Sequence, residues 1–335
     1  MKYSSVQKTL LLMALLMGFQ GAHAQATEKI TLQLRWLPQA QFAGYYVAAA
    51  KGYYKAEGLD VVILPGGPNI NTLQSATKNQ ADIVVQHLTD VLVGREAGVG
   101  LVNIAQIFNR SGLMLTCKKS SGVESTKDFK GKTLGVWVGG TESAFLSWMI
   151  KLGYQPGVDI KVLKQGFNID PLLKNQAACI STMSYNEYLQ VLDAGLKETD
   201  LTRFFYEDQG VATLEDGLYV LEDQLKDPAF VARTAKFLRA SLKGWRDAVK
   251  NPDEAANILV KNDKTGSMIF KVQKRQMESV AKLIGNPDSP KFGFMEQSAY
   301  NRTVKILVSG GNNAMLKKDP ANAGFSRLVW DAAQK

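Results

Sequence analysis

The sequence predicts an α/β protein built as two doubly wound lobes around a central ligand cleft. Segments typical of strands alternate with helix-like segments from residue 30 to residue 108, and the alternation starts again at residue 133. Beyond about Gly217 the chain is predicted to be mostly helical. Alternating strands and helices indicate parallel sheets covered by helices on both faces. We therefore expect one lobe from residues 27–116 with 218–335, and a second lobe from residues 117–217.

In the first lobe, strands are expected where apolar residues alternate with polar ones or form short runs. The first strand alternates, and the second ends at the run Pro-Gly-Gly-Pro, which no strand interior would accommodate. The four strands are predicted at residues 30–36, 59–64, 81–85 and 101–108. The helices between them are predicted at residues 42–51, 71–78 and 90–97.

The second lobe repeats this order, and a helical return follows it. Its strands are predicted at residues 133–138, 160–163, 178–183 and 204–206. Its helices are predicted at residues 142–152, 171–175 and 187–194. The C-terminal helices are predicted at residues 228–251, 252–262, 272–284 and 297–309. Two lobes joined by two crossings are typical of a clamp that holds its ligand in the cleft.

The N-terminus indicates export. Lys2 and Lys8 precede an apolar run at residues 10–19, and residues 22–24 (Ala-His-Ala) form a small-x-small cleavage site. This order is typical of a secretory signal peptide, and the run is too short to span a bilayer. We therefore expect residues 1–24 to be removed and the mature protein to move freely in a periplasm. No cysteine stands at the junction, so a lipid anchor is not indicated.

Composition is typical of a globular protein. Hydrophobic residues make up 45% of the chain and charged residues 21%. The formal charge of +9 falls to +7 once Lys2 and Lys8 leave with the signal peptide. Basic residues are interleaved with acidic ones along the chain, with no clustered stripe and no nucleic-acid-binding motif. We therefore expect no nucleic-acid partner.

The two cysteines and the few histidines argue against a metal site. Cys117 ends one apolar run and Cys179 lies in another, so each is expected to be a small buried residue on a different lobe. An oxidising compartment would allow them to pair, but their contexts favour two free thiols. The mature chain keeps a single histidine, His87, and no CxxC pair, so no metal and no cofactor are expected.

Candidate ligand-binding residues follow the first strand. Trp36 and Tyr45 can stack on a flat ring, and Gln39 and Gln41 carry donor and acceptor atoms. They lie just past the carboxyl end of that strand, where open parallel sheets place ligands. The alternative is that the aromatic rings belong to the core and the glutamines to a solvated turn; for Trp36, beside a proline, the cleft is favoured.

Further candidates follow strands of both lobes. Trp137 precedes Gly140 and Glu142, in a glycine turn that opens a helix whose exposed amides suit a carbonyl or an anion. A turn capped by a threonine explains the same residues without a ligand. After another strand come Tyr185, Asn186 and Glu187, which offer a ring face and paired hydrogen-bonding edges, although Asn186 could simply cap the next helix.

Catalytic constellations are absent from the sequence. There is no G-x-S-x-G, no phosphate-binding loop and no histidine pair. Catalysis would have to rely on His87, which follows an apolar strand and is more typical of a satisfied cleft or core residue. No catalytic residue is therefore predicted.

A set of motifs in order along nearly the whole mature chain carries a family resemblance. The motifs are WLPQAQFAGYYVAAAKGYYKAEGLDV, PGGPNI, VNIAQIFNRSG, GKTLGVWVGGTE and SYNEYLQVLDAG. Together they resemble the thiamine-pyrimidine-synthase-like branch of periplasmic binding proteins. The resemblance implies the type II periplasmic binding fold and an ABC importer for a pyrimidine precursor of thiamine or for riboflavin. It therefore also implies a monomer whose partner is an inner-membrane ABC permease. The amino-acid sequences of the first and third motifs are similar to those of the riboflavin-binding members in particular.

The same family contains fungal enzymes that build the thiamine pyrimidine from pyridoxal phosphate and a histidine of their own chain. Aligned with them, this chain has Gln86 in place of their lysine and Asp90 in place of their histidine. Phe42 replaces a further histidine, and their cysteine cluster has no counterpart here. Without the amine no Schiff base forms. Gln86 and His87 therefore join the ligand-binding candidates, and no enzyme activity is expected.

Three hypotheses follow. The first is a periplasmic receptor that delivers a small aromatic heterocycle to an ABC importer. The second is a thiamine pyrimidine synthase, which the missing lysine, histidine and cysteine cluster oppose. The third is a receptor of the same fold for sulfonate, nitrate or an aliphatic solute, which would need a cleft with anion donors and few aromatic rings.

Overall fold

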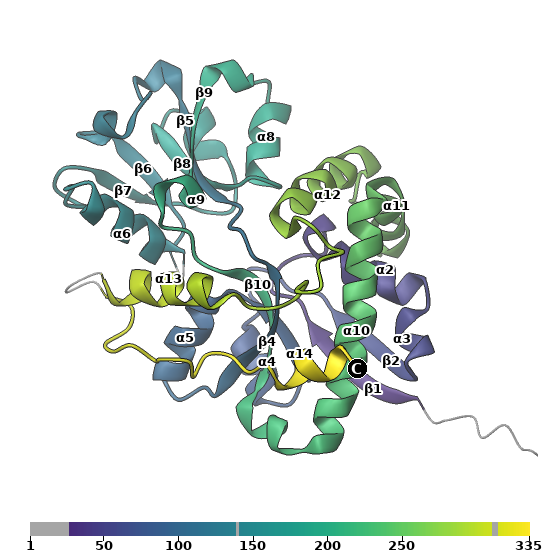
Figure 1. Ribbon diagram of the computed structural model, residues 1–335. Helices are drawn as coiled ribbons and strands as arrows, with labels where there is room; N and C mark the ends of the chain where they lie inside the picture. Colours follow the sequence, from purple (N-terminus) through teal and green to yellow (C-terminus); the bar gives the residue numbers. More distant parts are fainter. Residues whose placement is uncertain (1–26, 139–140, 310–313) are drawn as a thin grey trace, which may run out of the picture.

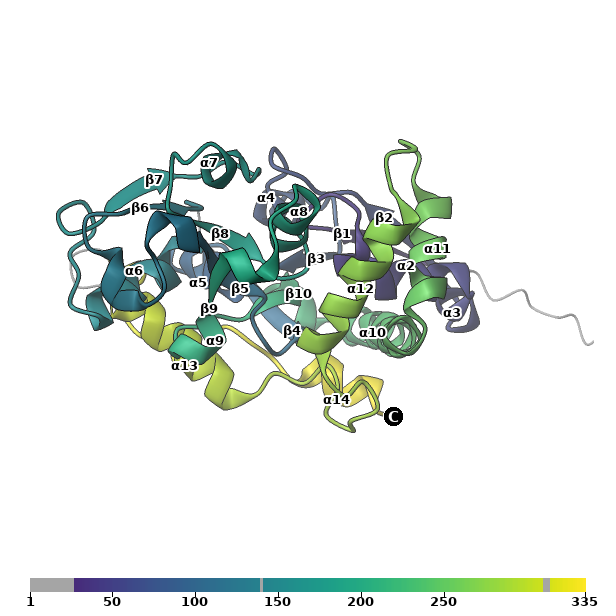
Figure 2. The same cartoon turned by 90° about the horizontal axis from the view of Figure 1, so that it is seen from above.

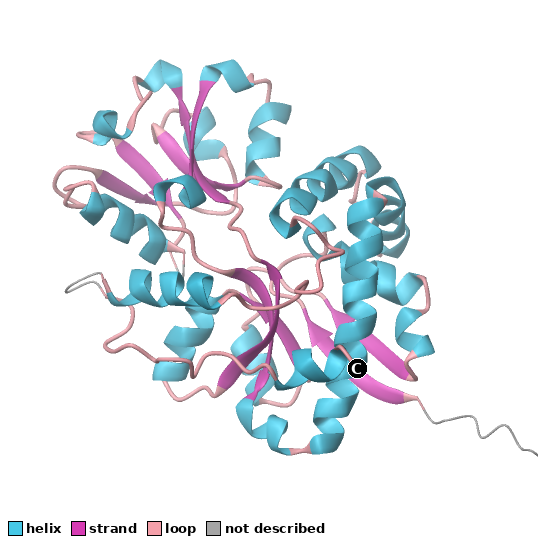
Figure 3. Cartoon of the chain, viewed as in Figure 1, coloured by secondary structure: helices cyan, strands magenta, loops and turns pink. Residues whose placement is uncertain are grey.

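The apolar runs of the chain pair into two separate five-stranded sheets in a computed structural model (Figures 1 and 3). The described residues are 27–138, 141–309 and 314–335, so the predicted signal peptide lies outside them. Over these residues, no helix has the length and apolar character needed to cross a membrane.

The first sheet has the strand order β2-β1-β3-β10-β4. Its strands are β1 (Glu28–Gln33), β2 (Leu59–Leu64), β3 (Ile83–Gln86), β4 (Leu101–Phe108) and β10 (Glu215–Leu221). β1 pairs parallel to β2 with Ile30 opposite Val61, and also parallel to β3. β10 runs antiparallel between β3 and β4. The expected all-parallel sheet is therefore mixed, because the chain re-enters this lobe through a strand that runs against its neighbours.

The second sheet has the strand order β7-β6-β8-β5-β9. Its strands are β5 (Leu113–Lys118), β6 (Thr133–Val136), β7 (Lys161–Lys164), β8 (Cys179–Met183) and β9 (Leu201–Phe205). β6 is parallel to β7 and β8, while β5 is antiparallel to β8 and β9. This sheet is mixed for the same reason, since β5 is the strand by which the chain enters the lobe. The chain enters the second sheet at Leu113 and returns to the first sheet at Glu215, a few residues before the predicted lobe boundaries at 117 and 218.

Helices lie around both sheets (Figures 1 and 2). Those of the first half of the chain are α2 (Ala43–Ala50), α3 (Tyr53–Ala56), α4 (Thr72–Thr77) and α5 (Leu88–Glu96). The second lobe carries α6 (Glu142–Lys151), α7 (Asp170–Leu173), α8 (Glu187–Asp193) and α9 (Tyr206–Gln209). The C-terminal part forms α10 (Pro228–Lys250), α11 (Pro252–Asn262), α12 (Phe270–Ile284), α13 (Gln297–Val308) and α14 (Leu328–Ala333).

The long helix α10 fixes the C-terminal return on the first lobe. Asp227 caps its first turn by accepting from the Ala229 amide at 2.9 Å, and Pro228 at the first helical position suits a helix start. α10 packs on α2 through two glycines. A Cβ on Gly44 would collide with the Trp245 ring, and a Cβ on Gly244 would collide with the backbone of Gly44. The two helices can therefore approach only because both positions lack a side chain.

The two cysteines form a disulfide, which corrects the expectation of free thiols on different lobes. Cys117 lies on β5 and Cys179 on β8, directly opposite each other in the antiparallel register, with 3.9 Å between their Cα atoms. Both are fully buried in the second lobe. Both cysteines were correctly expected to be buried, and Cys179 was expected in a strand. β5 was not predicted, and its pairing with β8 brings the thiols together.

Two chain segments cross between the lobes, from β4 to β5 and from α9 to β10 (Figure 1). The buried carboxylate of Glu215 ties them together by accepting from the Ser111 hydroxyl and, at 2.9 Å, from the Gly112 amide. The Glu207 carboxylate accepts from the Ser111 amide at 2.7 Å. The crossings are thus held side by side by acidic side chains of the second segment.

The Glu215 carboxyl should make stability fall as pH rises. Burial raises its pKa to about 7 from an ordinary 4.5. Between these values the unfolded chain has lost the proton that the folded chain keeps, so the unfolding free energy decreases with rising pH across that window. Glu215→Gln cannot ionise. In urea unfolding, the free energy of unfolding of the variant relative to that of the wild-type protein should therefore increase from about pH 4.5 to about pH 7. A pH-independent difference between the two proteins would contradict this.

Candidate functional site

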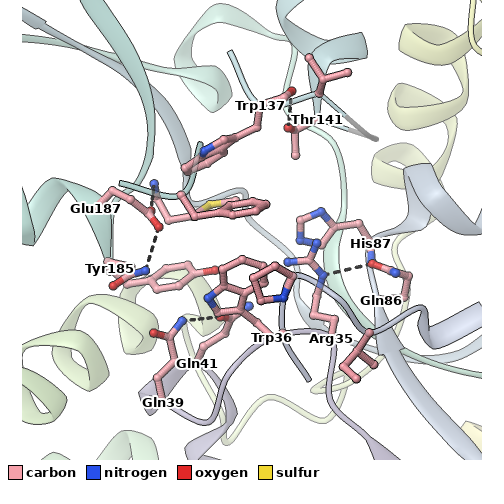
Figure 4. Close-up of a pocket in the computed structure, with 17 residues that line it drawn as sticks. Arg35, Trp36, Gln39, Gln41, Gln86, His87, Trp137, Thr141, Tyr185 and Glu187 are labelled. Atoms are coloured by element: carbon pink, nitrogen blue, oxygen red, sulfur yellow. Dashed lines mark hydrogen bonds between the residues drawn. The ribbon is translucent and has the colours of Figure 1, made fainter. Parts of the chain in front are cut away.

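A cavity of about 250 Å³ lies between the lobes, where strands of both sheets end (Figure 4). Arg35 and Trp36 follow β1, and His87 follows β3. Trp137 follows β6, and Tyr185 follows β8. The carboxyl ends of parallel strands therefore build both walls. The full lining is Arg35, Trp36, Gln39, Gln41, Gly67, Pro68, Ile70, Gln86, His87, Trp137, Val138, Thr141, Phe167, Met183, Tyr185, Asn186 and Glu187.

Aromatic rings form the apolar part of this cavity. Trp36 of the first lobe meets Phe167 of the second with ring centroids 4.7 Å apart and an interplanar angle of 59°. Trp137 is held by its indole N–H, which donates to the Gly166 carbonyl at 3.0 Å. Tyr185 is buried, with its ring edge against Phe108 at a centroid distance of 6.2 Å. A flat ring can therefore find aromatic partners on both lobes.

The predicted glutamines form a chain of hydrogen bonds beneath the rings. Gln39 donates to the Gln41 side-chain carbonyl at 2.7 Å, and Gln41 donates to the Asp216 carboxylate at 2.6 Å. The short 3₁₀ turn that carries Gln41, Ala40–Phe42, is fixed because the Ala40 amide donates to Gln273 of α12 at 2.8 Å. Burial raises the pKa of Asp216 to about 6, against the opposing effect of Arg35.

Arg35, Gln86 and His87 make up the polar wall of the first lobe. The Arg35 Nε–H donates to the Gln86 side-chain carbonyl at 3.1 Å, which also accepts from the His87 amide at 2.8 Å. Gln86 donates in turn to the Thr72 hydroxyl at 2.8 Å. The His87 Nε2 lies 3.6 Å from an Asp216 oxygen. Burial, with Arg35 nearby, lowers the pKa of His87 well below its usual value, so a neutral imidazole faces the cavity.

Asn186 and Glu187 lie on the cavity wall, but their polar atoms are largely engaged by the protein. The Glu187 carboxylate accepts from the Met183 amide at 2.9 Å and from the Asn186 side chain at 2.8 Å. Burial raises the Glu187 pKa. The Asn186 carbonyl accepts from Gln276 of α12 at 3.1 Å. Asn186 and Glu187 therefore shape the cavity wall and link the two lobes. Most of their hydrogen-bonding atoms are used by the protein and are not available to a ligand.

Two predicted site residues do not line the cavity, and a third is not described. Tyr45 lies in the core, 1% exposed, with its ring 5.5 Å from Trp245, because α2 turns that face toward α10. Glu142 opens α6 without reaching the lining, where Thr141 stands in its place and donates to the Trp137 carbonyl at 3.2 Å. Gly140 lies outside the described residues.

Two residues that the sequence did not single out stand out in the lining. Arg35 directly precedes Trp36 at the end of β1, so the rule that strand ends meet could have identified it. Phe167 lies in the loop after β7, another strand that ends at this edge. That loop carried no other local signal, since one exposed aromatic residue in a loop is common.

The lobes also meet beside the cavity, along α8 and α12 (Figure 1). Arg275 of α12 pairs with Asp193 of α8 at 2.6 Å and donates to the Leu189 carbonyl at 3.3 Å. On the opposite side, the Ser147 hydroxyl of α6 lies 3.2 Å from that of Ser309. These contacts, with the Trp36–Phe167 pair, hold the cleft narrow. In the described ranges, no cluster of three or more His, Cys, Asp or Glu could hold a metal ion.

Known proteins of similar sequence include binding proteins and synthases. The riboflavin-binding protein RibY of Chloroflexus aurantiacus is 29% identical over 303 residues, covering 86% of this chain and 83% of that protein. The formylaminopyrimidine-binding protein of Halalkalibacterium halodurans is 24% identical over 288 residues, covering 84% and 86%. The 4-amino-5-hydroxymethyl-2-methylpyrimidine phosphate synthase of Schizosaccharomyces pombe is 28% identical, over 45% of this chain and 43% of that protein.

Solved structures confirm the two-lobed α/β fold. The periplasmic aliphatic sulphonate binding protein SsuA of Escherichia coli superposes with a TM-score of 0.66 at 12% identity, covering 88% of this chain and 90% of that chain. The fold is thus that of type II periplasmic binding proteins. A model of the family described as NMT1/THI5 like matches residues 39–255, which is more than half of the chain. The resemblance seen in the motifs is therefore confirmed, and the chain belongs to the NMT1/THI5-like family.

Proposed function

We propose that this protein is the periplasmic solute-binding component of an ABC importer and that it binds a small aromatic heterocycle. The observation that carries the proposal is the cavity between the lobes, with aromatic rings from both lobes and hydrogen-bonding side chains at its floor. Relatives named for binding riboflavin and a formylaminopyrimidine, over most of their length, support it. The permease partner and removal of residues 1–24 on export belong to the same proposal.

The cavity also limits the size of the ligand. Its volume of about 250 Å³ corresponds to about eight water molecules at their share of liquid volume. A one- or two-ring heterocycle therefore fits, or the polar end of a larger ring system whose remainder extends through the mouth. An aliphatic sulfonate would leave the rings of Trp36, Phe167 and Trp137 without a flat partner.

The direct test is to identify what the protein carries. Protein purified from the periplasm without refolding should release an aromatic heterocycle detectable by mass spectrometry. Riboflavin or a formylaminopyrimidine added to ligand-free protein should raise the melting temperature, and the rise should follow the logarithm of ligand concentration. An aliphatic or inorganic anion as the released molecule would instead support the sulfonate or nitrate hypothesis.

The competing function is pyrimidine synthesis, and the lining opposes it. No lysine stands among the described residues that line the cavity. Lys51, which follows α2 in the first-lobe motif, is paired with Asp247 at 3.0 Å and with Glu254 at 2.7 Å. These carboxylates raise the Lys51 pKa, so its amine is protonated and is a poor nucleophile.

Incubation with pyridoxal phosphate followed by borohydride should therefore leave no stoichiometric adduct at any single lysine. Peptide mapping by mass spectrometry measures this directly, and a synthase of the family that uses pyridoxal phosphate serves as the positive control. A specific reduced adduct, together with loss of His87 from the peptide map, would replace the transport proposal with the enzymatic one.

A further inference from the structure

Arg35 is the one cationic side chain in the lining described above, and its position is unusual. Its Nε–H donates to Gln86 at 3.1 Å, and the same nitrogen lies 4.0 Å from an Asp216 oxygen. Both partners thus lie on the Nε side of the guanidinium. Figure 4 shows the group reaching into the cavity beside His87. The opposite edge, formed by the two terminal nitrogens, is the part that can meet a ligand.

These two terminal nitrogens have no protein acceptor within hydrogen-bond distance among residues 27–138, 141–309 and 314–335. They carry four N–H groups on a permanently charged, planar fork. The side chain is 21% exposed, so water access is restricted. Water can still reach these N–H groups in the open cleft. A ligand that supplies acceptors would take the place of that water and pair the fork directly.

The glutamines of the first-lobe wall already hydrogen-bond within the protein. The Gln86 carbonyl accepts twice, and its amide donates to Thr72. Gln39 and Gln41 donate along the chain that ends at Asp216. The His87 Nε2 has no hydrogen-bond partner among the described residues, so the wall offers a ligand this single imidazole nitrogen and the Arg35 fork. Of the two, only the fork matches two neighbouring acceptors.

The charge around Arg35 favours a neutral acceptor edge over an anion. Asp216 already lies beside the guanidinium, 4.0 Å from its Nε, and compensates part of its charge. An anionic ligand would bring a second negative charge next to that carboxylate. A ring with a carbonyl and a neighbouring acceptor would satisfy the fork without that penalty. An exocyclic amino group at the same edge would instead place N–H donors against N–H donors.

We propose that Arg35 determines ligand specificity by pairing its terminal N–H groups with the carbonyl-bearing edge of a neutral oxo-heterocycle, and that it rejects amino-substituted rings. This rests on the proposed function as a heterocycle receptor. Of the two ligand types named for the relatives, it favours riboflavin, whose pyrimidine ring carries two carbonyls, over an aminopyrimidine.

A matched pair of probes tests this inference by isothermal titration. 2,4-Dioxopteridine and 2,4-diaminopteridine have the same two-ring frame. They differ in the groups at positions 2 and 4, and with them in N1 and N3, which carry hydrogen in the dioxo compound and none in the diamino compound. The wild-type protein should bind the dioxo probe at least about 10-fold more tightly. Arg35→Gln should weaken the dioxo probe by about 10- to 100-fold, the range for a bidentate pair. It should leave the diamino probe unchanged or improved, because the glutamine carbonyl can accept from an amino group.

Control variants separate specificity from structure. Arg239→Gln removes one positive charge on α10, from a pair with Glu57 away from the lining, and should leave the ratio of affinities unchanged. Equal weakening of both probes by Arg35→Gln would assign Arg35 a purely structural role and overturn the inference. A wild-type preference for the diamino probe would also overturn the inference, but the proposal that the protein binds an aromatic heterocycle would stand. If neither probe nor riboflavin binds, the proposed ligand class itself fails, and this inference fails with it.

Discussion

Replacing Cys117 and Cys179 together by alanine should lower the free energy of unfolding by about 4 kcal/mol. The disulfide joins residues that are 62 positions apart and so closes a long loop in the unfolded chain. Chain-entropy estimates for a loop of this length are near that value. Alanine is preferred to serine because both positions are fully buried, and a serine there would bury a hydroxyl group. Urea unfolding followed by circular dichroism measures the effect.

The controls for this prediction use the redox state. Wild-type protein unfolded and refolded with a reducing agent should approach the stability of the double variant, while the double variant should not respond to the reducing agent. Each single variant should lose about as much stability as the double variant, since either change breaks the bond. A double variant as stable as the oxidised wild-type protein would show that the disulfide adds nothing to the fold.

The cysteine pair shows what a reading of local sequence leaves out. Both cysteines were correctly expected to be buried, and β8 was predicted within one residue of its observed start, but β5 was not predicted as a strand. The strand order of a sheet is a non-local property, however. β5 enters the second lobe as the antiparallel neighbour of β8, and that pairing alone brings Cys117 opposite Cys179. Nothing within the sequence near either residue encodes it.

The elements that were predicted best are those whose local pattern decides their structure. The bounds of β2 and β4 match the predicted strands, since both are mostly apolar runs, LDVVIL and LVNIAQIF, and each has a glycine or proline at one end. β10 was missed because it opens with Glu215, Asp216 and Gly217, which are typical of a turn. Both carboxyls are buried there because groups distant in sequence bond them: Ser111 and Gly112 for Glu215, and Gln41 for Asp216.

The candidate site was predictable as far as the strand-end rule reaches. Trp36, His87, Trp137 and Tyr185 all follow strands whose carboxyl ends meet, and all four line the cavity. Asp216 could not be found this way, because it enters from an antiparallel strand that begins at the site. Tyr45 failed for a different reason: helical spacing alone does not say which face of α2 meets α10.

Replacing Trp36 by alanine should weaken the binding of riboflavin by about 1–3 kcal/mol, the range for the loss of a stacked aromatic partner. Trp36 is partly exposed in the cavity and lies 4.7 Å from Phe167 of the other lobe. The substitution therefore removes a ring face from the ligand site and also a contact that helps to keep the cleft closed. Titration calorimetry measures the affinity, and ligand-induced quenching of tryptophan fluorescence should diminish, because Trp36 and Trp137 are the tryptophans that line the cavity.

Two further variants separate these contributions to the affinity. Trp36→Phe keeps an aromatic face and should recover much of the lost affinity if stacking on the ligand dominates. Phe167→Ala leaves Trp36 in place but removes its partner across the cleft, so its effect reports the contact between lobes together with any contact of Phe167 with the ligand. The losses of binding free energy in Trp36→Ala and Phe167→Ala should not add up in the double variant, since the two rings touch. Unchanged affinity in Trp36→Ala would remove this residue from the binding site and, with it, the central aromatic wall of the proposed heterocycle receptor.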